Sequence, residues 1–529
     1  MSKKKQIVFY SIIPIIALSV FINTIDNKST DKQQDTAKIK NMVTVKEFEK
    51  GEISKIQNRS NIIHNIATIN LEKQTKGKSS GYENKPEITY DDKFKSSNII
   101  IHEDIIIFPE PAGLIDIQID TLENPLPNSK AEGDLPVMLK LTTGGASLST
   151  YGKIKVQGSS TAIWPKKNWT LKFYSDEERT NELRLKIGNS IASDKWIAKA
   201  EWIDPTMLRN ALSYRLWEGM VKSRKDFPQY EVDYAWIGKN NMYEGVQTGA
   251  QGFPRTYPAI VKVNGNHYGI SLFVLGHDPR NFNIDKDNPK HMYMEFDARF
   301  GYTSVKTWDK FSAEGINQWI DGYHPKNEDM SEVQREAIDA LGKLINGSLD
   351  NFIESFDKHL DKRNMIDMLL FMEAIYDWDA VAQDIEMVTY DLEKWYMLPW
   401  DKDTSFGLFY DGSGLLENRE TKILINCESE DPAQKPWYKT YHAFKPEIEA
   451  RYAELRNENI FSGYYLYKIA GEITKKIPKE IWEAERLRWE KDERPSLDET
   501  STYQVISWFE KRLEMLDEHF NYKVTEEHK

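Results

Sequence analysis

Apolar and polar side chains alternate through the first half of the body of the chain. Four stretches follow this two-residue period: 137–143, 152–158, 168–174 and 257–275. Glycine and proline mark the turns around these stretches, and such alternation predicts strands. The pair Asn264-Gly265 interrupts the last stretch and favours a hairpin turn. We therefore expect the region 98–278 to be rich in β-structure.

Helical patterns dominate the second half of the chain. Three long segments are expected to be helical: 331–360, 362–378 and 437–519. A short strand pair, 385–391 and 394–400, interrupts them. An earlier helix is expected over 204–220, with Asp204 as its N-cap and Pro205 in its first turn. Strands first and helices afterwards predict an α+β protein of two lobes, a β-rich N-lobe and a helical C-lobe.

The first residues combine basic and apolar side chains. Lys3, Lys4 and Lys5 precede the apolar stretch 7–22, an order typical of a signal peptide or a membrane anchor that sends the body out of the cytoplasm. A polar segment follows and is expected to be a linker. The expected divisions are a signal or anchor segment (1–23), a polar linker (24–97), the N-lobe (98–278), the C-lobe (279–436) and a C-terminal helical extension (437–529).

The composition of the chain argues against several classes of function. The formal net charge is -13, which argues against a nucleic-acid partner, because contact with phosphates normally needs a basic face. Aromatic residues make up 12% of the chain, more than a disordered protein carries, so most of the chain is expected to fold. Cys427 is the only cysteine, which excludes an internal disulfide and a cysteine-rich zinc site.

The first candidate for chemistry is a small-residue turn followed by a lysine-bearing strand. Gly158, Ser159 and Ser160 lie between two predicted strands, and such a turn can offer backbone N–H groups and hydroxyls to a phosphate. Alternation places Lys172 on the polar face of the next strand, and Lys167 lies in the connecting loop. The alternative is an ordinary hairpin turn beside solvated lysines.

The second candidate is an acidic loop after an apolar helix. Asp377 and Asp379 follow residues 368–376, and Asp384 comes after four intervening residues. Phosphoryl transfer needs one carboxylate to orient the acceptor hydroxyl and a nearby oxygen ligand for a metal ion, and protein kinases take both from an Asp-x4-Asn loop. The alternative is a solvated acidic loop at a helix end. The apolar setting disfavours it, because unpaired carboxylates are costly there.

The third candidate is a pair of carboxylates at the end of an apolar strand. Asp401 and Asp403 follow Pro399-Trp400 and precede Gly407. On an extended segment the two side chains share one side and could hold a divalent cation between them. The alternative is a surface turn that ends in acidic residues.

Six segments in this order resemble the spore-coat protein H (CotH) kinase-like family: 157–161, 165–173, 195–212, 263–275, 379–384 and 399–407. The resemblance implies a kinase-like fold. It also implies an enzyme that uses ATP with Mg²⁺ or Mn²⁺ to phosphorylate Ser/Thr residues of a coat or envelope protein. By the same resemblance, Asp379 is the base that orients the acceptor, and Asp384 and Asp401 are metal ligands. Lys172 matches the lysine that pairs with the phosphates, with Lys167 as its rival.

Three positions depart from the pattern of that family. Gln157 stands where arginine is usual, His277 where an acidic residue is usual, and Asp384 where asparagine is usual. The change at His277 bears on the adenine side of the site. The change at Asp384 keeps a hard oxygen ligand but adds a negative charge.

Other function classes stay open at this point. A kinase-fold enzyme could transfer the nucleotidyl part of ATP, and a non-catalytic pseudokinase could act as a scaffold for coat or envelope assembly. A carbohydrate-active protein would explain the 15 Trp residues and the paired carboxylates, since sugar hydrolysis uses two of them. It would not explain Lys172. The expected location is the membrane, through the N-terminal segment, or the spore surface.

Overall fold

The computed structural model describes part of the chain. The described residues are 87–90, 100–102, 104–158, 160–188, 190–227, 254–296, 308–309, 311–314, 316, 320–412, 414–415, 418–492 and 501–523. The expected signal or anchor segment, 1–23, lies outside these residues, as does most of the expected linker. None of the described helices is long and apolar enough to cross a bilayer.

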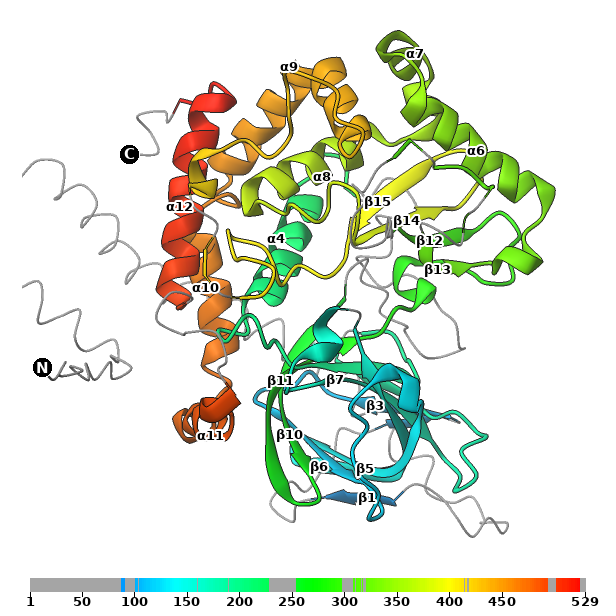
Figure 1. Ribbon diagram of the computed structural model, residues 1–529, viewed down its shortest axis with the longest axis vertical. Coiled ribbons are helices and arrows are strands. Elements are labelled where there is room, and N and C mark those ends of the chain that lie inside the picture. Colours follow the sequence, from blue (N-terminus) through cyan, green and yellow to red (C-terminus); the bar gives the residue numbers. More distant parts are fainter. Residues whose placement is uncertain are drawn as a thin grey trace, which may run out of the picture. The chain divides into compact units, whose positions relative to one another are not determined.

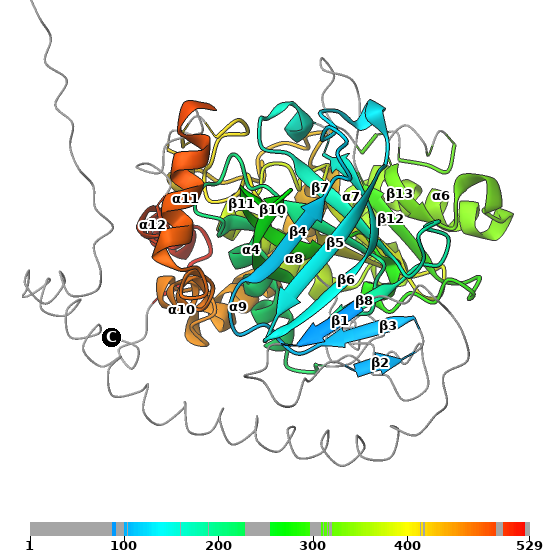
Figure 2. The same ribbon diagram turned by 90° about the horizontal axis from the view of Figure 1, so that it is seen from below.

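Eight strands form the main sheet, in the order β1-β6-β5-β4-β10-β11-β9-β7. These strands are β1 (Glu87–Tyr90), β4 (Ile115–Asp120), β5 (Leu135–Thr143), β6 (Ala146–Gln157), β7 (Asn168–Tyr174), β9 (Lys195–Lys199), β10 (Thr256–Val263) and β11 (Asn266–Leu275). The long β6 pairs with β1 along its first half and with β7 along its second half, which joins the two ends of the sheet (Figures 1 and 2). A smaller sheet contains β2 (Ile100–His102), β3 (Ile105–Phe108) and β8 (Arg184–Ile187).

Strand β1 lies inside the segment 24–97 that was expected to be a linker. It pairs with β6 in antiparallel register, with Glu87 opposite Ser149. Backbone hydrogen bonding at the free edge of β6 therefore brings the start of the sheet forward, which the polar composition of this segment did not indicate.

The β-rich region, residues 104–275 without α4, has an apolar core of its own. Trp169, Leu171 and Phe173 of β7 are almost fully buried in it, as their alternation predicted. Trp196 and Ala198 of β9 enter the same core. The residues between them on β7 and β9 therefore lie on the opposite face of the sheet.

Helix α4 (Arg209–Lys222) begins later than the sequence indicated. Asp204 does not cap it. Its carboxylate accepts hydrogen bonds from the backbone N–H groups of Leu208 and Arg209, at 3.1 and 2.9 Å, and lies 2.6 Å from the Arg209 guanidinium. These contacts stabilise a turn before the helix, and Leu208 occupies the N-cap position. The apolar face of α4 packs in the helical region, although its sequence position falls within the expected N-lobe.

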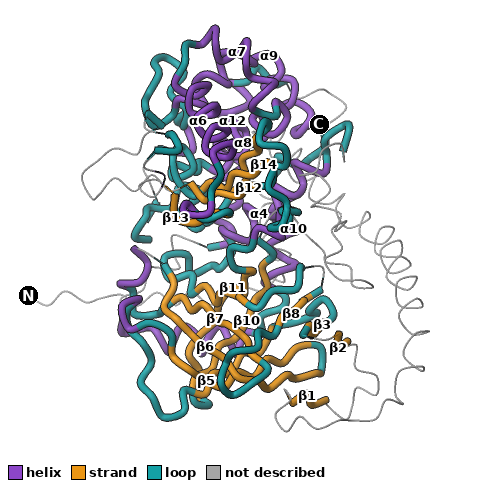
Figure 3. The backbone as a smooth tube through the Cα atoms, turned by 90° about the vertical axis from the view of Figure 1, so that its right-hand side faces the viewer, coloured by secondary structure: helices purple, strands orange, loops and turns teal. Residues whose placement is uncertain are grey.

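The helical region contains a four-stranded sheet and most of the helices. Its strands are β12 (Met292–Phe296), β13 (Ile320–His324), β14 (Ile385–Thr389) and β15 (Trp395–Pro399). Its helices are α6 (Glu332–Asn346), α7 (Leu349–His359), α8 (Lys362–Ile375), α9 (Lys435–Asn457), α10 (Gly463–Thr474) and α12 (Thr502–His519). The structure confirms β14 and β15 as the predicted strand pair, and they are antiparallel. Figure 3 shows most of these helices above the strands of the main sheet.

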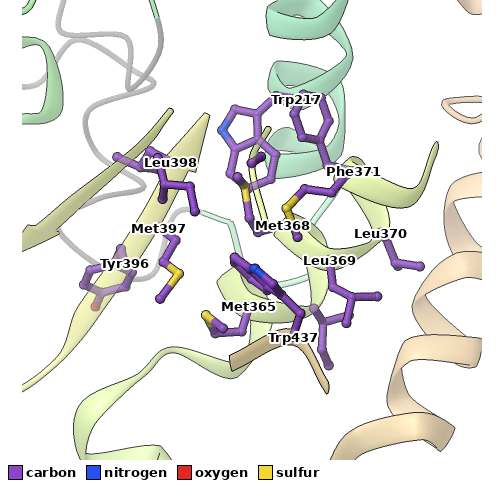
Figure 4. Close-up of a cluster of buried hydrophobic side chains, with 14 of the residues drawn as sticks. Trp217, Met365, Met368, Leu369, Leu370, Phe371, Tyr396, Met397, Leu398 and Trp437 are labelled. Carbon is purple, nitrogen blue, oxygen red and sulfur yellow. The ribbon is translucent and has the colours of Figure 1, made fainter. Parts of the chain in front are cut away.

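The core of the helical region is dense in aromatic and sulfur side chains. Met365 and Met368 of α8, Trp217 of α4, Trp437 of α9 and Met397 of β15 lie together and are fully buried (Figure 4). Burial of one such side chain contributes about 1.5–3 kcal/mol to stability. Because α8 is buried on every side, the loop that follows it starts from a fixed position. The chain is thus a mixed α+β protein, as the sequence predicted.

Candidate active site

A lysine of the β-rich region meets an aspartate of the helical region. Lys199 is the last residue of β9 and lies on the face of the sheet opposite the apolar core. Its ammonium forms an ion pair with the carboxylate of Asp401. Burial by itself would lower the pKa of Lys199, but Asp401, Asp403 and Glu201 raise it above its usual value. Lys199 is therefore charged and is held by carboxylates.

Asp401 is positioned by its backbone as well as by Lys199. It follows β15 and Trp400 and adopts a left-handed conformation, with φ of 47°. Its N–H donates a 3.0 Å hydrogen bond to the hydroxyl of Tyr214, which belongs to α4. A positive φ is unfavourable for residues other than glycine, so these contacts fix an otherwise strained turn. The side chain keeps 30% of its surface exposed, so the carboxylate is accessible to solvent.

More carboxylates surround Lys199 than one lysine can neutralise. Burial raises the pKa of Asp403 well above its usual value, and the negative charges of Asp401, Glu201 and Asp384 raise it further against the opposing effect of Lys199. Burial raises the pKa of Glu201 to about 7, while Lys199 lowers it. Three carboxyl groups thus act on one ammonium group, and Asp384 acts on Asp403. Carboxyl groups outnumber the ammonium group, and the raised pKa values of Asp403 and Glu201 reflect this imbalance.

The loop after α8 contains the two aspartates of the second motif in different roles. Asp377 is fully buried and lies 2.7 Å from the ammonium of Lys402, which is also fully buried. Burial raises the pKa of Asp377, and Lys402 opposes that shift. Lys402 also donates to the carbonyl of Asp384 at 3.1 Å. This ion pair therefore joins the loop after α8 to the loop after β15.

Asp379 lies beside the loop that carries Asp401 and Asp403. Its carboxylate accepts a 3.1 Å hydrogen bond from the hydroxyl of Thr404, and 9% of the residue is exposed. Asp384 has a left-handed backbone, with φ of 51°, and its side chain accepts from the Gln383 amide at 3.0 Å. The second and third motifs, which are about twenty residues apart in sequence, therefore meet in space.

A small pocket lies on the side of Lys199 that faces the glycine turn. Its lining consists of Thr161, Trp164, Lys166, Asn168, Lys199, Glu201, Trp202, Ile203 and Asp403. The pocket combines the residues after the glycine turn, the start of β7, the end of β9 and the loop after β15. Residues beside the first and third motifs thus line one pocket, and the second motif adjoins the third through the hydrogen bond between Thr404 and Asp379.

The glycine turn is longer than a simple hairpin connection. After Gly158 the chain forms a 3-10 helix, Ser160–Ile163, before β7 begins. Gly158 has φ of 105°, and a Cβ atom there would lie 1.9 Å from the hydroxyl of Thr161, so only glycine fits. Ser159 and the side chain of Ser160 lie outside the described residues, and their predicted contact with phosphate stays a prediction.

Two lysines predicted to contact phosphate lie away from the carboxylates. Lys172 is half-buried on β7 opposite Lys195, whereas Lys199 lies at the other end of β9. Lys195 and Lys199 are four residues apart on β9, a separation of about 13 Å along the strand. The ammonium of Lys167 donates to the carbonyl of Ala162 at 2.8 Å, and burial lowers its pKa. Sequence alternation gave the correct face of β7 for Lys172 but not the end of the strand that meets Asp401.

The histidine that departs from the family pattern has acidic neighbours. Nδ1 of His277 lies 3.2 Å from Glu295, 3.3 Å from Glu386 and 3.2 Å from the hydroxyl of Tyr293. Its ring packs on Trp400 with centroids 3.7 Å apart. Burial lowers the pKa of His277 well below its usual value and raises that of Glu386 to about 8. Two glutamates thus lie beside the position at which the family pattern has an acidic residue.

Sequence analysis missed Lys199 and Glu201. Both lie in the segment 195–212, where a strand of buried residues ends in Lys-Ala-Glu. Two charged residues at the end of an otherwise buried strand are the signal that could have identified them. Within the described ranges, no group of three or more His, Cys, Asp or Glu side chains is arranged so as to hold a metal ion.

Comparison with known families identifies the family of this chain. A family model described as CotH kinase protein matches residues 154–516, well over half of the chain. The chain therefore belongs to the CotH kinase family, which makes it a kinase-like protein. No curated protein matches it. The match extends beyond the six motifs and includes α10, the helix α11 (Lys479–Trp489) and most of α12.

Proposed function

We propose that this protein is an atypical Ser/Thr protein kinase that uses ATP and a divalent metal ion and acts outside the cytoplasm, on a protein of the coat or envelope. The observation that carries the proposal is the ion pair between Lys199 and Asp401, with Asp379 in the adjacent loop. A kinase needs these three groups at one place: a lysine for the phosphates, an aspartate for the metal ion and an aspartate for the acceptor hydroxyl. Membership of the CotH kinase family supports a kinase-like function.

Each charged group has a role in this proposal. The ammonium of Lys199 binds phosphate oxygens of the nucleotide, a role that the resemblance had given to Lys172. Asp379 accepts the proton of the Ser or Thr hydroxyl and orients its oxygen toward the γ-phosphate. The β-rich region and the helical region act as the two lobes, with the nucleotide between them.

The carboxylates suit a hard divalent cation. Asp384, Asp401 and Asp403 would supply the carboxylate ligands of Mg²⁺ or Mn²⁺. Because Mg²⁺ is usually held by one or two carboxylates together with waters and phosphate oxygens, a preformed group of three side chains, which the described residues do not contain, is not required. When bound, the ion neutralises the charge of the phosphates. Asp401 would hold the ion in place of the ammonium of Lys199, and Lys199 would then be available to the nucleotide. The partly exposed side chain of Asp401 is compatible with this change of partner.

Phosphate transfer by the full chain tests the proposal. The protein, in detergent, is incubated with γ-labelled ATP and casein, with and without Mg²⁺ or Mn²⁺, beside Asp379→Asn. We expect metal-dependent label on protein and at least about 100-fold less with the variant. ATP labelled at the α-phosphate distinguishes nucleotidyl transfer, and an absence of ATP binding would favour a scaffold. Either outcome would contradict the kinase assignment.

A further inference from the structure

Helix α11 returns from the C-terminal part of the chain and lies against β11 of the β-rich region (Figures 1 and 2). Glu485 of α11 is 3% exposed. One of its carboxylate oxygens lies 2.7 Å from the ammonium of Lys166, and the other accepts a 2.7 Å hydrogen bond from the N–H of Ile270. The side chain of Lys166 is fully buried. An acidic residue more than 300 positions away thus neutralises a lysine in the loop after the glycine turn.

Lys166 connects this ion pair to the candidate active site. Its ammonium donates a 2.9 Å hydrogen bond to the carbonyl of Ala200, the residue between Lys199 and Glu201. The N–H of Ala200 donates to the side chain of Asn168 at 2.7 Å. Glu201 has a left-handed backbone, with φ of 48°, which is unfavourable without support. Hydrogen bonds therefore fix both the carbonyl and the N–H of Ala200, and Lys166 makes one of these two bonds.

The contact between α11 and the sheet is close and specific. A Cβ atom at Gly269 would lie 2.7 Å from both the Glu485 carboxylate and the Lys166 side chain, so the absence of a side chain there allows the approach. The indole N–H of Trp489 donates to the carbonyl of Tyr268 at 3.1 Å, and its ring meets Trp202 edge to face. Trp202 in turn lines the pocket. Helix α11 thus touches the pocket wall at two separate points.

We infer that α11 is a built-in positioning element for the nucleotide site. Glu485 fixes the ammonium of Lys166, Lys166 fixes the carbonyl of Ala200, and the orientation of Lys199 and Glu201 depends on that carbonyl. Glu485 and Lys166 are positioning residues, since neither belongs to the Lys199–Asp401 pair. The inference rests on the proposed function for its effect on nucleotide binding, but the coupling itself is a property of the fold.

Kinetics of the full chain test the role of Glu485. Glu485→Gln keeps an acceptor for the N–H of Ile270 but removes the charge that holds Lys166. We expect the KM for ATP to rise by roughly 2- to 30-fold, the range typical of couplings carried through a network of contacts. The matched control is Glu483→Gln, on the same helix, where the side chain is 54% exposed and pairs only with Arg486 among the described contacts. The control is expected to leave the KM unchanged.

A double variant separates positioning from the cost of a buried charge. Glu485→Gln combined with Lys166→Met removes both charges, so the thermal stability lost in the single variant should return. The hydrogen bond from Lys166 to Ala200 stays absent, and the KM for ATP should stay raised. Recovery of the KM together with stability would overturn the inference, as would an unchanged KM in Glu485→Gln.

Hydrogen exchange tests the coupling without any enzymatic activity. Amides of residues 195–204 should exchange faster in Glu485→Gln and in the double variant than in the wild type or Glu483→Gln. Equal exchange in all four proteins would overturn the coupling. A wild-type chain that transfers no phosphate would overturn the proposed function instead, and the exchange measurement would still decide whether α11 holds this segment.

Discussion

Two lysine–aspartate pairs lie near each other and differ in one property. The pair Lys402–Asp377 is inside the helical region, and both side chains are fully buried. The pair Lys199–Asp401 joins the two regions, and the carboxylate of Asp401 keeps 30% of its surface exposed. A buried pair cannot exchange its partner for a ligand, whereas a partly exposed one can. The first pair therefore holds the loops together, and the second belongs to the candidate active site.

The largest difference between the pairs should appear in stability. Lys402→Met leaves the buried Asp377 without a partner and should lower the free energy of unfolding by about 3–5 kcal/mol. Lys199→Met should cost about 1 kcal/mol, because Asp401 reaches water. Urea denaturation followed by tryptophan fluorescence measures both. Equal losses would show that exposure does not separate the two pairs.

Activity should depend on Lys199 far more than on Lys172. Lys199→Met should lower kcat/KM for ATP by about 100-fold or more, since it removes a charged donor from the phosphate site. Lys172→Met is the matched variant on the neighbouring strand and should have a far smaller effect, because Lys172 lies at the other end of the strand pair. Steady-state kinetics with casein as the acceptor compare the two. A larger loss with Lys172→Met would return the phosphate role to Lys172.

The most gradual effect should be a pH dependence of stability that arises from Glu201, beside Lys199. Burial raises the pKa of Glu201 to about 7 from its usual value of 4.5. The folded state then binds a proton that the unfolded state has released, so this contribution to stability is complete below pH 4.5 and is lost as the pH rises to about 7. A rise from 4.5 to about 7 corresponds to a change of up to about 3 kcal/mol over this pH range.

Glu201→Gln should reduce this slope, and Glu354→Gln, an exposed position on α7, should leave it intact. Unfolding midpoints in urea between pH 4.5 and 7.5 measure the slope. Identical slopes in the wild type and Glu201→Gln would contradict the raised pKa.

Much of the fold followed from local pattern. Alternation identified β7 and the face of its apolar residues, and the strand pair β14–β15 was expected within a few residues of its observed bounds. The start of α4 was wrong because the Asp204 carboxylate binds a turn and the Arg209 guanidinium instead of capping the helix. Strand β1 was missed because its pairing with β6 depends on a partner sixty residues away.

The residues of the candidate site also fall into those predicted from local pattern and those that depend on distant partners. The sequence by itself predicted the carboxylates Asp379, Asp401 and Asp403, because short motifs after apolar elements indicate them, and all three lie within the residues that match the family. Only the tertiary structure decided that Lys199 meets Asp401 and that Glu485 holds Lys166. These partners lie about 200 and 300 residues apart. Periodicity fixes the face of a strand, but sheet register and helix packing decide which distant charge reaches it.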